Sequence, residues 1–510
     1  MARVVVIVPN WNGLNFIERC LRSLCAQSFE YFETVVVDNG STDGSAELVE
    51  ARFPTVRLIR LPKNRGFSVA VNVGLKETAS EYVAFLNNDT EVEALWLSEL
   101  VRALDAHPSA GSAASKIFWD SDRERLYAAG DFFCAEGFGG NMGASLTEGT
   151  AHNERTWVFS ASACASLYRR CVLDEIGLLE ERFFMFYEDI DLGFRAQLAG
   201  WPCIVVPEAV VYHTGTATAG IFSQMRRYCL ARNELFVLAR NLLGPILRRS
   251  VWSILRHQLK ASVQALDEGW PATLLRARIA AIAALPWLLR SRRDIMAKRL
   301  ASTDQIASLI RPYDEIYPPA SIPDAHSVPR AWASATGARV LIIRSAGPLL
   351  RRAIDYARSS LSAQEIDVLT MPGHEDTGPS ADGICAITYP RRERFCGLTM
   401  PARFAERLRV RRYDAAMILC GGDPETGFLN VDLVALRAGP KRIIYFTPDG
   451  STREFDGRLF SKKLARFALN ACLAASAFAA SVVFMAAIVT ATVLEGRRCK
   501  RTGAAAVRES

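Results

Sequence analysis

The densest group of potential catalytic side chains is a run of three carboxylates, Glu188, Asp189 and Asp191, directly after a stretch of aromatic residues. Carboxylates that are crowded together or lie in apolar surroundings have raised pKa values, and a carboxylate with a raised pKa is suited to take a proton from a hydroxyl group. The same acids would also suit the positive N-terminal end of a helix. The run therefore predicts a general base and leaves a purely structural role open.

A second set of residues could bind a divalent cation. Asp89 directly follows an apolar run that predicts a buried strand, and His213 follows another apolar run at 210–212. A carboxylate and an imidazole beside a diphosphate would make a Mn²⁺ or Mg²⁺ site. Taken singly, an aspartate in a turn or a lone histidine in a core is more often structural.

A third set could bind phosphate or nucleotide. The stretch 64–74 combines Arg65 with glycines that allow close backbone approach, and it leads into a predicted helix whose start would favour an anion. Polar residues also follow three of the predicted strands, in the pairs and triplets Pro9-Asn10, Asp38-Asn39-Gly40 and Asn87-Asn88-Asp89.

These residues need a scaffold that brings them together. Residues 1 to about 110 alternate apolar strand runs with amphipathic helix patterns, which predicts a parallel, doubly wound α/β sheet. In such a sheet ligands bind at the carboxyl ends of the strands, where all three polar strand ends would converge. We expect strands at 4–8, 34–37, 56–61 and 82–86, and helices at 14–25, 45–51 and 67–78. Further on we expect helices at 188–199 and 221–243 and strands at 201–206 and 210–212.

The order of these motifs resembles that of the inverting family-2 glycosyltransferases of GT-A fold, particularly the non-processive rhamnosyltransferase-like branch. The resemblance covers about residues 3–245. It rests on six motifs in order: Val8-Pro9-Asn10-Trp11-Asn12-Gly13, the run from Val37 to Ser45, Asn64-Arg65-Gly66-Phe67 with Asn72-Val73-Gly74, Leu86-Asn87-Asn88-Asp89-Thr90, Tyr187-Glu188-Asp189-Ile190-Asp191-Leu192, and His213.

The resemblance implies a role for each matching residue. Asp189 would be the catalytic base with Glu188 beside it, and Asp89 and His213 would hold Mg²⁺ or Mn²⁺ on the donor diphosphate. The nucleotide-sugar would be bound by Pro9, Asn10, Asp38, Asn64, Arg65, Gly66 and Asn88. One departure is that Asn87 stands where the family's Asp-x-Asp motif has its first aspartate, which removes one charged metal ligand.

The rest of the chain divides into four further segments, which follow a GT-A domain at 1–243. Residues 244–310 read as basic amphipathic helices, because positions 240–299 hold twelve Lys and Arg but three acids, interleaved with Leu, Ile and Trp. Five prolines mark 311–337 as a linker. Residues 338–460 read as a second, smaller α/β domain of unclear role, faintly similar to half of a GT-B glycosyltransferase. Residues 467–494 lack any charge and predict a transmembrane helix.

Composition excludes several classes of protein. Half of the 510 residues are apolar, so the chain is not disordered, and no Cys-x-x-Cys spacing occurs among the twelve cysteines, so a zinc finger has no support. Reduced thiols in a cytosolic compartment are expected, and no signal peptide precedes the first strand. The basic segment lacks a nucleic-acid recognition motif, so nucleic acid is not an expected partner.

We therefore expect an enzyme that moves a sugar from a dTDP-, UDP- or GDP-linked donor to a hydroxyl of a glycan acceptor on a polyprenyl carrier. It would act at the cytoplasmic face of the inner membrane, in cell-envelope polysaccharide synthesis. Two alternatives stay open: a processive polysaccharide synthase, for which one predicted span is too few to build a channel, and a membrane-tethered scaffold that has lost catalysis.

Overall fold

The computed structural model describes residues 2–143, 153–215, 223–317, 338–343, 349–370, 384–389, 400–420 and 429–506. The chain forms two compact units. The first comprises Met1–Ser262, Ala272–Pro318 and Ser476–Ser510, and the second comprises Val263–Pro271 and Pro319–Ala475. The five predicted segment boundaries remain a prediction.

The first unit is built on a mixed sheet in the strand order β10-β12-β6-β11-β4-β1-β2-β3, with β5 and β7 pairing at its margin. Its strands are β1 (Val4–Asn10), β2 (Phe32–Asp38), β3 (Arg57–Arg60), β4 (Tyr82–Leu86), β5 (Thr90–Val92), β6 (Ser112–Trp119), β7 (Asp122–Ala129), β10 (Trp157–Val158), β11 (Ala165–Arg169) and β12 (Cys203–His213). A separate hairpin pairs β8 (Asp131–Phe133) with β9 (Gly139–Asn141).

The parallel half of this sheet confirms the predicted α/β fold. Strand β1 runs parallel to both β2 and β4, and its register pairs Asn10 with Asp38 at the ends of their strands. The chain therefore leaves β1 toward β2 on one side and reaches β4 on the other side, so the strand order reverses at β1. Open α/β sheets bind ligands in the crevice at the point where the strand order reverses. The predicted polar strand ends lie at this edge.

The second half of the sheet is partly antiparallel, because β11 lies between β4 and β6 and runs against both. The two strands predicted at 201–206 and 210–212 are one strand, β12, whose register shifts between Val206 and Val210. This irregularity keeps β12 paired with β6 as far as His213, so the strand delivers that histidine to the end of the sheet.

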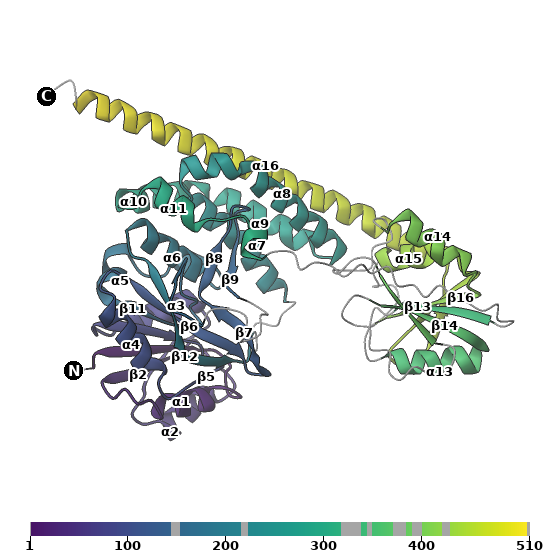
Figure 1. Cartoon of the computed structure of the whole chain (residues 1–510), viewed down its shortest axis with the longest axis horizontal. Coiled ribbons are helices and arrows are strands. Elements are labelled where there is room, and N and C mark those ends of the chain that lie inside the picture. The colour runs from purple at the N-terminus through teal and green to yellow at the C-terminus, as the bar shows by residue number, and fades with distance from the viewer. Residues whose placement is uncertain are drawn as a thin grey trace. The chain divides into compact units, whose positions relative to one another are not determined.

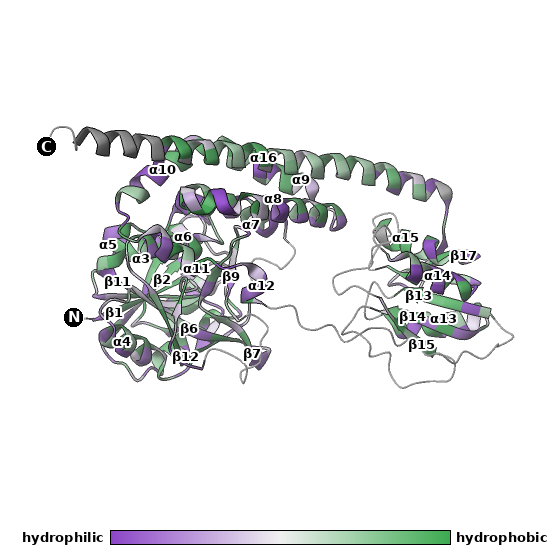
Figure 2. Ribbon diagram, turned by 45° about the horizontal axis from the view of Figure 1, so that its top comes forward, coloured by the Kyte–Doolittle hydropathy of each residue, from purple (hydrophilic) through white to green (hydrophobic). Residues whose placement is uncertain are grey.

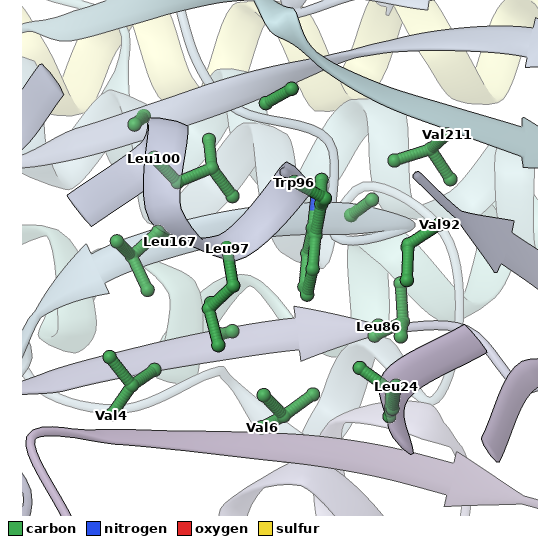
Figure 3. Close-up of a cluster of buried hydrophobic side chains, with 14 of the residues drawn as sticks. Val4, Val6, Leu24, Leu86, Val92, Trp96, Leu97, Leu100, Leu167 and Val211 are labelled. Atoms are coloured by element: carbon green, nitrogen blue, oxygen red, sulfur yellow. The ribbon is translucent and has the colours of Figure 1, made fainter. Parts of the chain in front are cut away.

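Helices on the sheet bury its apolar faces. Helix α1 places Ile17, Cys20, Leu21 and Leu24 against the core at helical spacing, as predicted. Figure 3 shows part of this core, in which Trp96 is fully buried among aliphatic side chains. The covering helices are α1 (Ile17–Cys25), α2 (Ser45–Arg52), α3 (Phe67–Lys76), α4 (Trp96–Ala106), α5 (Arg170–Ile176) and α6 (Glu188–Leu198), with the 3₁₀ helix η2 (Glu181–Phe183) before α6.

A helical layer follows the sheet within the same unit (Figure 1). Its buried residues, among them Leu235, Ile254 and Leu288, share one apolar cluster with Phe194 of α6 and Phe484 of α16. The helices are α7 (Gln224–Asn241), α8 (Gly244–Asp267), α9 (Pro271–Ala283), α10 (Leu285–Ala297), α11 (Thr303–Leu309), α12 (Tyr313–Ile316) and α16 (Gly457–Ala506). Helix α8 belongs to this unit as far as Ser262, α9 from Ala272, and α16 from Ser476.

The second unit contains a six-stranded sheet in the order β15-β14-β13-β16-β17-β18, parallel except for β18. This confirms a second, smaller α/β domain. Its elements are β13 (Ala338–Ile343), β14 (Ala363–Thr370), β15 (Ile384–Thr388), β16 (Ala415–Leu419), β17 (Arg442–Phe446), β18 (Thr452–Glu454), α13 (Leu350–Ser360), α14 (Ala402–Val410) and α15 (Leu429–Ala438).

Helix α16 is the one described helix that is long and apolar enough by itself to cross a membrane, over Phe460–Glu495. Helices α9 and α10 pass the same test only as a pair, and they meet at a bend of 59°. Most of the predicted linker lies outside the described residues. Ten of the twelve cysteines, from Cys20 to Cys472, are free thiols.

Candidate active site

Asn10 is the centre of a buried polar network at the end of β1. Its amide nitrogen donates to Asp38 Oδ1 at 3.1 Å and to Ser45 Oγ at 2.9 Å, while its amide oxygen accepts from Asn88 Nδ2 at 2.7 Å. A Cβ on Gly13 would lie 2.1 Å from Asn88 Nδ2, so the glycine is required for this close packing. The structure thus brings together three of the predicted donor-binding residues, and Pro9 directly precedes Asn10 on β1.

Asn39 holds the glycine turn that contains the other three. Its side-chain oxygen accepts from the backbone N–H of Arg65 at 2.9 Å, and its nitrogen donates to Asn64 Oδ1 and to the Gly66 carbonyl, both at 3.1 Å. The guanidinium of Arg65 lies on an exposed residue at this edge. The turn therefore has a fixed backbone and leaves one cation free to meet a phosphate.

Gly66 joins this turn to the loop before Asp189. Its φ is +92°, and a Cβ there would lie 2.5 Å from the carbonyl oxygen of Phe184. The next residue, Phe67, donates its backbone N–H to that same oxygen at 2.6 Å. The donor-side turn and the carboxylate-bearing loop are therefore in direct backbone contact.

The loop before Asp189 is strained. Phe184, Phe186 and Tyr187 have φ values of 68°, 66° and 69°, in the left-handed region that costs non-glycine residues energy. Such a run persists only where surrounding contacts fix it, and it is found most often at functional sites.

Helix α7 supplies the contacts that fix this loop. The fully buried Asn233 donates from its side-chain nitrogen toward the carbonyls of Phe183, Met185 and Phe186, at 3.0, 2.9 and 2.7 Å. Arg232 donates to the Phe183 carbonyl as well, at 2.9 Å. Backbone groups that the strained turns leave without helix or sheet partners are thereby satisfied.

Asp189 and Glu188 begin α6 in an environment poor in donors. Among the described residues, Asp189 accepts from the backbone N–H groups of Ala163, at 3.3 Å, and Ile190, at 2.8 Å. Burial raises the pKa of Asp189 above its ordinary value. Burial, with the nearby charge of Asp189, raises the pKa of Glu188 strongly, and Glu188 Oε2 is buried without a hydrogen bond.

A third acid shares this environment, and it is not Asp191. Asp131 on β8 is buried, and burial together with Asp189 raises its pKa well above the ordinary value. One of its oxygens accepts from Ser160 Oγ at 2.9 Å, and the other has no partner. Asp131 is a candidate that sequence reasoning missed, since nothing nearby in the sequence marks it.

Asp191 lies two residues from Asp189 and has the opposite surroundings. Burial acts to raise its pKa, but the guanidinium groups of Arg240 and Arg195 outweigh burial and hold the pKa of Asp191 below its usual value. Asn241 donates to it at 2.8 Å. Asp191 therefore anchors α6 on α7 and is not part of the crowded acid group.

The two predicted metal ligands meet in the folded chain. His213 Nε2 lies 3.1 Å from Asp89 Oδ1, both side chains are buried, and the ring of Tyr127 packs edge-on against the imidazole at 4.6 Å between centroids. The other ring nitrogen of His213 is buried and has no hydrogen-bond partner. Within the described ranges, no group of three or more His, Cys, Asp or Glu side chains is arranged to hold a metal.

These features agree with the comparisons with known proteins. The family model described as Glycosyl transferase family 2 matches residues 5–177. The N-acetylglucosaminyl-diphospho-decaprenol L-rhamnosyltransferase of Mycobacterium tuberculosis is 30% identical over 238 residues, which cover 42% of this chain and 77% of that protein. The chain belongs to glycosyltransferase family 2.

Other similarities cover parts of this glycosyltransferase. The O-antigen biosynthesis protein RfbC of Myxococcus xanthus is 29% identical over 227 residues, which span 42% of this chain and 18% of that protein. The structure of the mannosyltransferase PcManGT from Pyrobaculum calidifontis, in complex with GDP-Man and Mn²⁺, is 20% identical, covers 60% of this chain and 78% of that chain, and has a TM-score of 0.36.

The loop before Asp189, residues 183–187, is called here the base loop. Its contacts with α7 were not predicted from the sequence of this glycosyltransferase. A signal was present, since α7 carries two Arg-Asn pairs eight residues apart, Arg232-Asn233 and Arg240-Asn241. Eight residues are two helical turns plus about 80°, so both pairs lie on one broad face of the helix. That face meets the loop before Asp189 with Asn233 and the helix after it with Asn241.

Proposed function

We propose that the chain transfers a sugar from a nucleotide-sugar donor to a hydroxyl of a glycan acceptor by a single displacement that inverts the anomeric carbon. The observation that carries the proposal is the joining of two sites through Gly66. A polar network at the carboxyl ends of β1 and β2 lies on one side, and a partly buried carboxylate with a raised pKa, Asp189, lies on the other.

The donor side binds the nucleotide. The oxygens of Asp38 and Asn88 and the amide groups around Asn10 form a fixed polar surface at the strand ends. Arg65 places a cation beside the glycine turn, where it would pair with the diphosphate and stabilise it as it leaves. No covalent intermediate is needed, because the acceptor oxygen attacks as the diphosphate departs.

Asp189 takes the proton from the attacking hydroxyl. Its raised pKa brings the carboxylate closer to the pKa that general-base catalysis favours near neutral pH. Its two backbone hydrogen bonds fix the orientation of the carboxylate. Glu188 and Asp131 are acids with raised pKa values close to Asp189, and neither bonds to the backbone N–H groups that Asp189 uses.

Asp89 and His213 would hold a divalent cation, Mg²⁺ or Mn²⁺. A buried carboxylate oxygen beside an imidazole nitrogen fits either ion, with further ligands coming from the donor phosphates and water. When bound, the cation neutralises charge that develops on the leaving diphosphate.

The acceptor is proposed to be a glycan on a polyprenyl carrier, used in cell-envelope polysaccharide synthesis at the cytoplasmic face of the inner membrane. The basic helix α8 and the apolar helix α16 support a location at a membrane. The Mycobacterium tuberculosis relative, by its name, acts on such a lipid-linked sugar.

The proposal is tested by offering the purified full chain a panel of dTDP-, UDP- and GDP-sugars with Mn²⁺, with Mg²⁺ or with a chelator. We expect release of nucleoside diphosphate from one donor class, dependent on the cation and reduced in Asp89→Asn. Turnover that is unchanged by the chelator and by Asp89→Asn would refute the metal site. The absence of donor turnover and of donor binding by calorimetry would refute the transferase.

A further inference from the structure

We propose that α8 and α16 form one membrane-binding face that lies in the plane of an anionic phospholipid bilayer, so that α16 does not cross the bilayer. This deepens the membrane location in the proposed function. The face, called here the α8–α16 face, consists of the exposed side chains of Gly244–Ser262 and Ser476–Leu494. Both segments belong to the first unit.

Helix α16 packs lengthwise against the helical layer in this unit. Figures 1 and 2 both show α16 running along α8 and α10, and the part of α16 from Ser476 belongs to this unit. One side of it is buried at helical spacing, and this side comprises Ala477, Ser481, Phe484, Met485, Ile488 and Thr492. A helix held along its length in this way differs from a span that stands alone in lipid.

Contacts at two levels pair α16 with α8 in antiparallel order. Ser481 Oγ lies 3.5 Å from Gln258 Oε1. A Cβ on Gly244 would lie 3.1 Å from Thr492 Cβ. The stretch from 481 to 492 therefore lies beside the stretch from 258 back to 244. Beyond it, Glu495 forms an ion pair with the buried Arg292 of α10 at 3.0 Å.

This pairing decides between crossing the bilayer and lying on it. If Ser481–Thr492 entered the hydrocarbon, the adjoining stretch of α8 would enter as well, with its exposed Arg248, Arg249 and Arg256. An arginine side chain at the bilayer centre is strongly unfavourable even on insertion scales. A helix pair lying in the interface keeps these charges at the lipid phosphates and avoids that cost.

The composition of the face fits an anionic lipid surface. Residues 244–262 carry four basic side chains and no acid, and Trp252 on the same exposed side is 75% accessible. Residues 476–494 contain no charge, and Val482 and Val483 are exposed on the side away from the packed core. Arg248 lies at the seam, because its Nη1 would be 3.5 Å from the same Gly244 Cβ that meets Thr492. Basic residues would meet headgroups while Trp and Val enter the acyl boundary.

The direct test is the sidedness of the two ends of the full chain. Tags at the N- and C-termini are exposed to protease in inside-out vesicles of bacterial membranes. The α8–α16 face predicts that both tags are digested at similar rates. Digestion of the N-terminal tag with full protection of the C-terminal tag means that α16 crosses the bilayer, and this result overturns the proposal.

A second test measures binding to vesicles of phosphatidylcholine with or without phosphatidylglycerol by flotation. We expect binding that needs phosphatidylglycerol and falls by about tenfold or more in Arg248→Glu/Arg249→Glu. The matched control Arg22→Glu/Arg60→Glu makes the same charge change on exposed arginines of α1 and β3 and should bind like the unaltered chain. Equal binding by both double variants, or no binding by the unaltered chain, overturns the proposal.

Donor turnover in detergent is measured on the same preparations. Donor turnover by a chain whose C-terminal tag is protected would support the proposed function and refute the α8–α16 face. A chain that binds vesicles as expected but turns over no donor would retain the face and lose the proposed function.

Discussion

The donor edge and the base loop of the candidate active site are held in different ways. Asn10, Asp38 and Asn88 bond to one another across neighbouring strand ends, so the order of the strands already brings them together. The loop before Asp189 adopts three left-handed residues, and Asn233 from a later helix holds its carbonyls.

Under the proposed function, this difference separates the residues that bind the donor from the residue that takes the proton. Changes to α7 should disturb the position of Asp189 while leaving the donor network intact, because no described contact joins Asn233 to that network. Changes at Gly66 should disturb both, since its backbone lies against Phe184. The following variants break or sharpen this contrast, from the largest expected effect to the smallest.

Asp189→Asn should remove the proton acceptor with little change in side-chain shape, although the single amide oxygen can accept from only one of the two backbone N–H groups, Ala163 or Ile190. We expect kcat to fall by about 10²–10⁴-fold with donor binding unchanged. Steady-state rates and calorimetry with the donor measure the two effects. A kcat within a few-fold of the unaltered enzyme would show that another group accepts the proton.

Asn233→Leu should release the carbonyls of the base loop. A shift of the carboxylate by about 1 Å would lower kcat by about 10²-fold, with the KM for the donor unchanged. Asn233→Asp, which sets a carboxylate against three carbonyls, should be at least as impaired.

The matched control for Asn233 is Gln258→Leu, which removes another fully buried amide that donates to Glu234. It should lower the Tm without changing kcat in the folded enzyme. If both variants lower kcat equally, the contacts of Asn233 serve stability alone.

Gly66→Ala should impair both sides at once, because a methyl group would meet the Phe184 carbonyl and the residue would keep a positive φ. We expect kcat to fall and the donor KM to rise, each by about tenfold, with backbone strain of about 1–3 kcal/mol. Gly44→Ala is the control: it has the same kind of φ, +86°, but nothing lies within 4 Å of the added Cβ. If Gly44→Ala changes the same constants as much, φ strain alone accounts for the effect.

Glu188→Gln should raise the Tm slightly at neutral and alkaline pH. The pKa of Glu188 is raised in the folded state, so its stabilising contribution is present below the unfolded value of 4.5 and is lost as the pH rises through the folded value. Removing the ionisable group should therefore raise the Tm by about 2–4 °C above the folded pKa. Thermal unfolding across pH measures this, and the gain should disappear in acid. A Tm gain that is independent of pH would contradict the assignment.

The sequence predicted that Asn10, Asp38 and Asn88 come together, because these residues follow buried strands whose β-branched runs and parallel order can be inferred from the hydrophobic pattern alone. Their role in binding the donor stays a proposal. Asp89 and His213 also meet as expected. The prediction that Glu188, Asp189 and Asp191 crowd together is only partly right. Asp189 and Glu188 have raised pKa values, but Asp191 faces two arginines, and the third acid of the group is Asp131. Which acids share a site depends on the direction of each side chain and on the packing of β8 and α7 against α6. The local sequence around Asp189 shows neither the side-chain directions nor this packing.

The prediction at 467–494 shows a related limit. Composition identifies a charge-free helix but cannot tell whether lipid or protein lies beside each face. The buried side of α16 and its pairing with α8 emerge only from packing.

The anomeric configuration of the sugar in the transferred product tests the mechanism most directly. Proton magnetic resonance of the product, formed from a donor of known configuration, gives the answer without any variant. A single displacement assisted by Asp189 predicts the configuration opposite to that of the donor. Retention of the donor configuration would contradict a single displacement and with it the role given to Asp189.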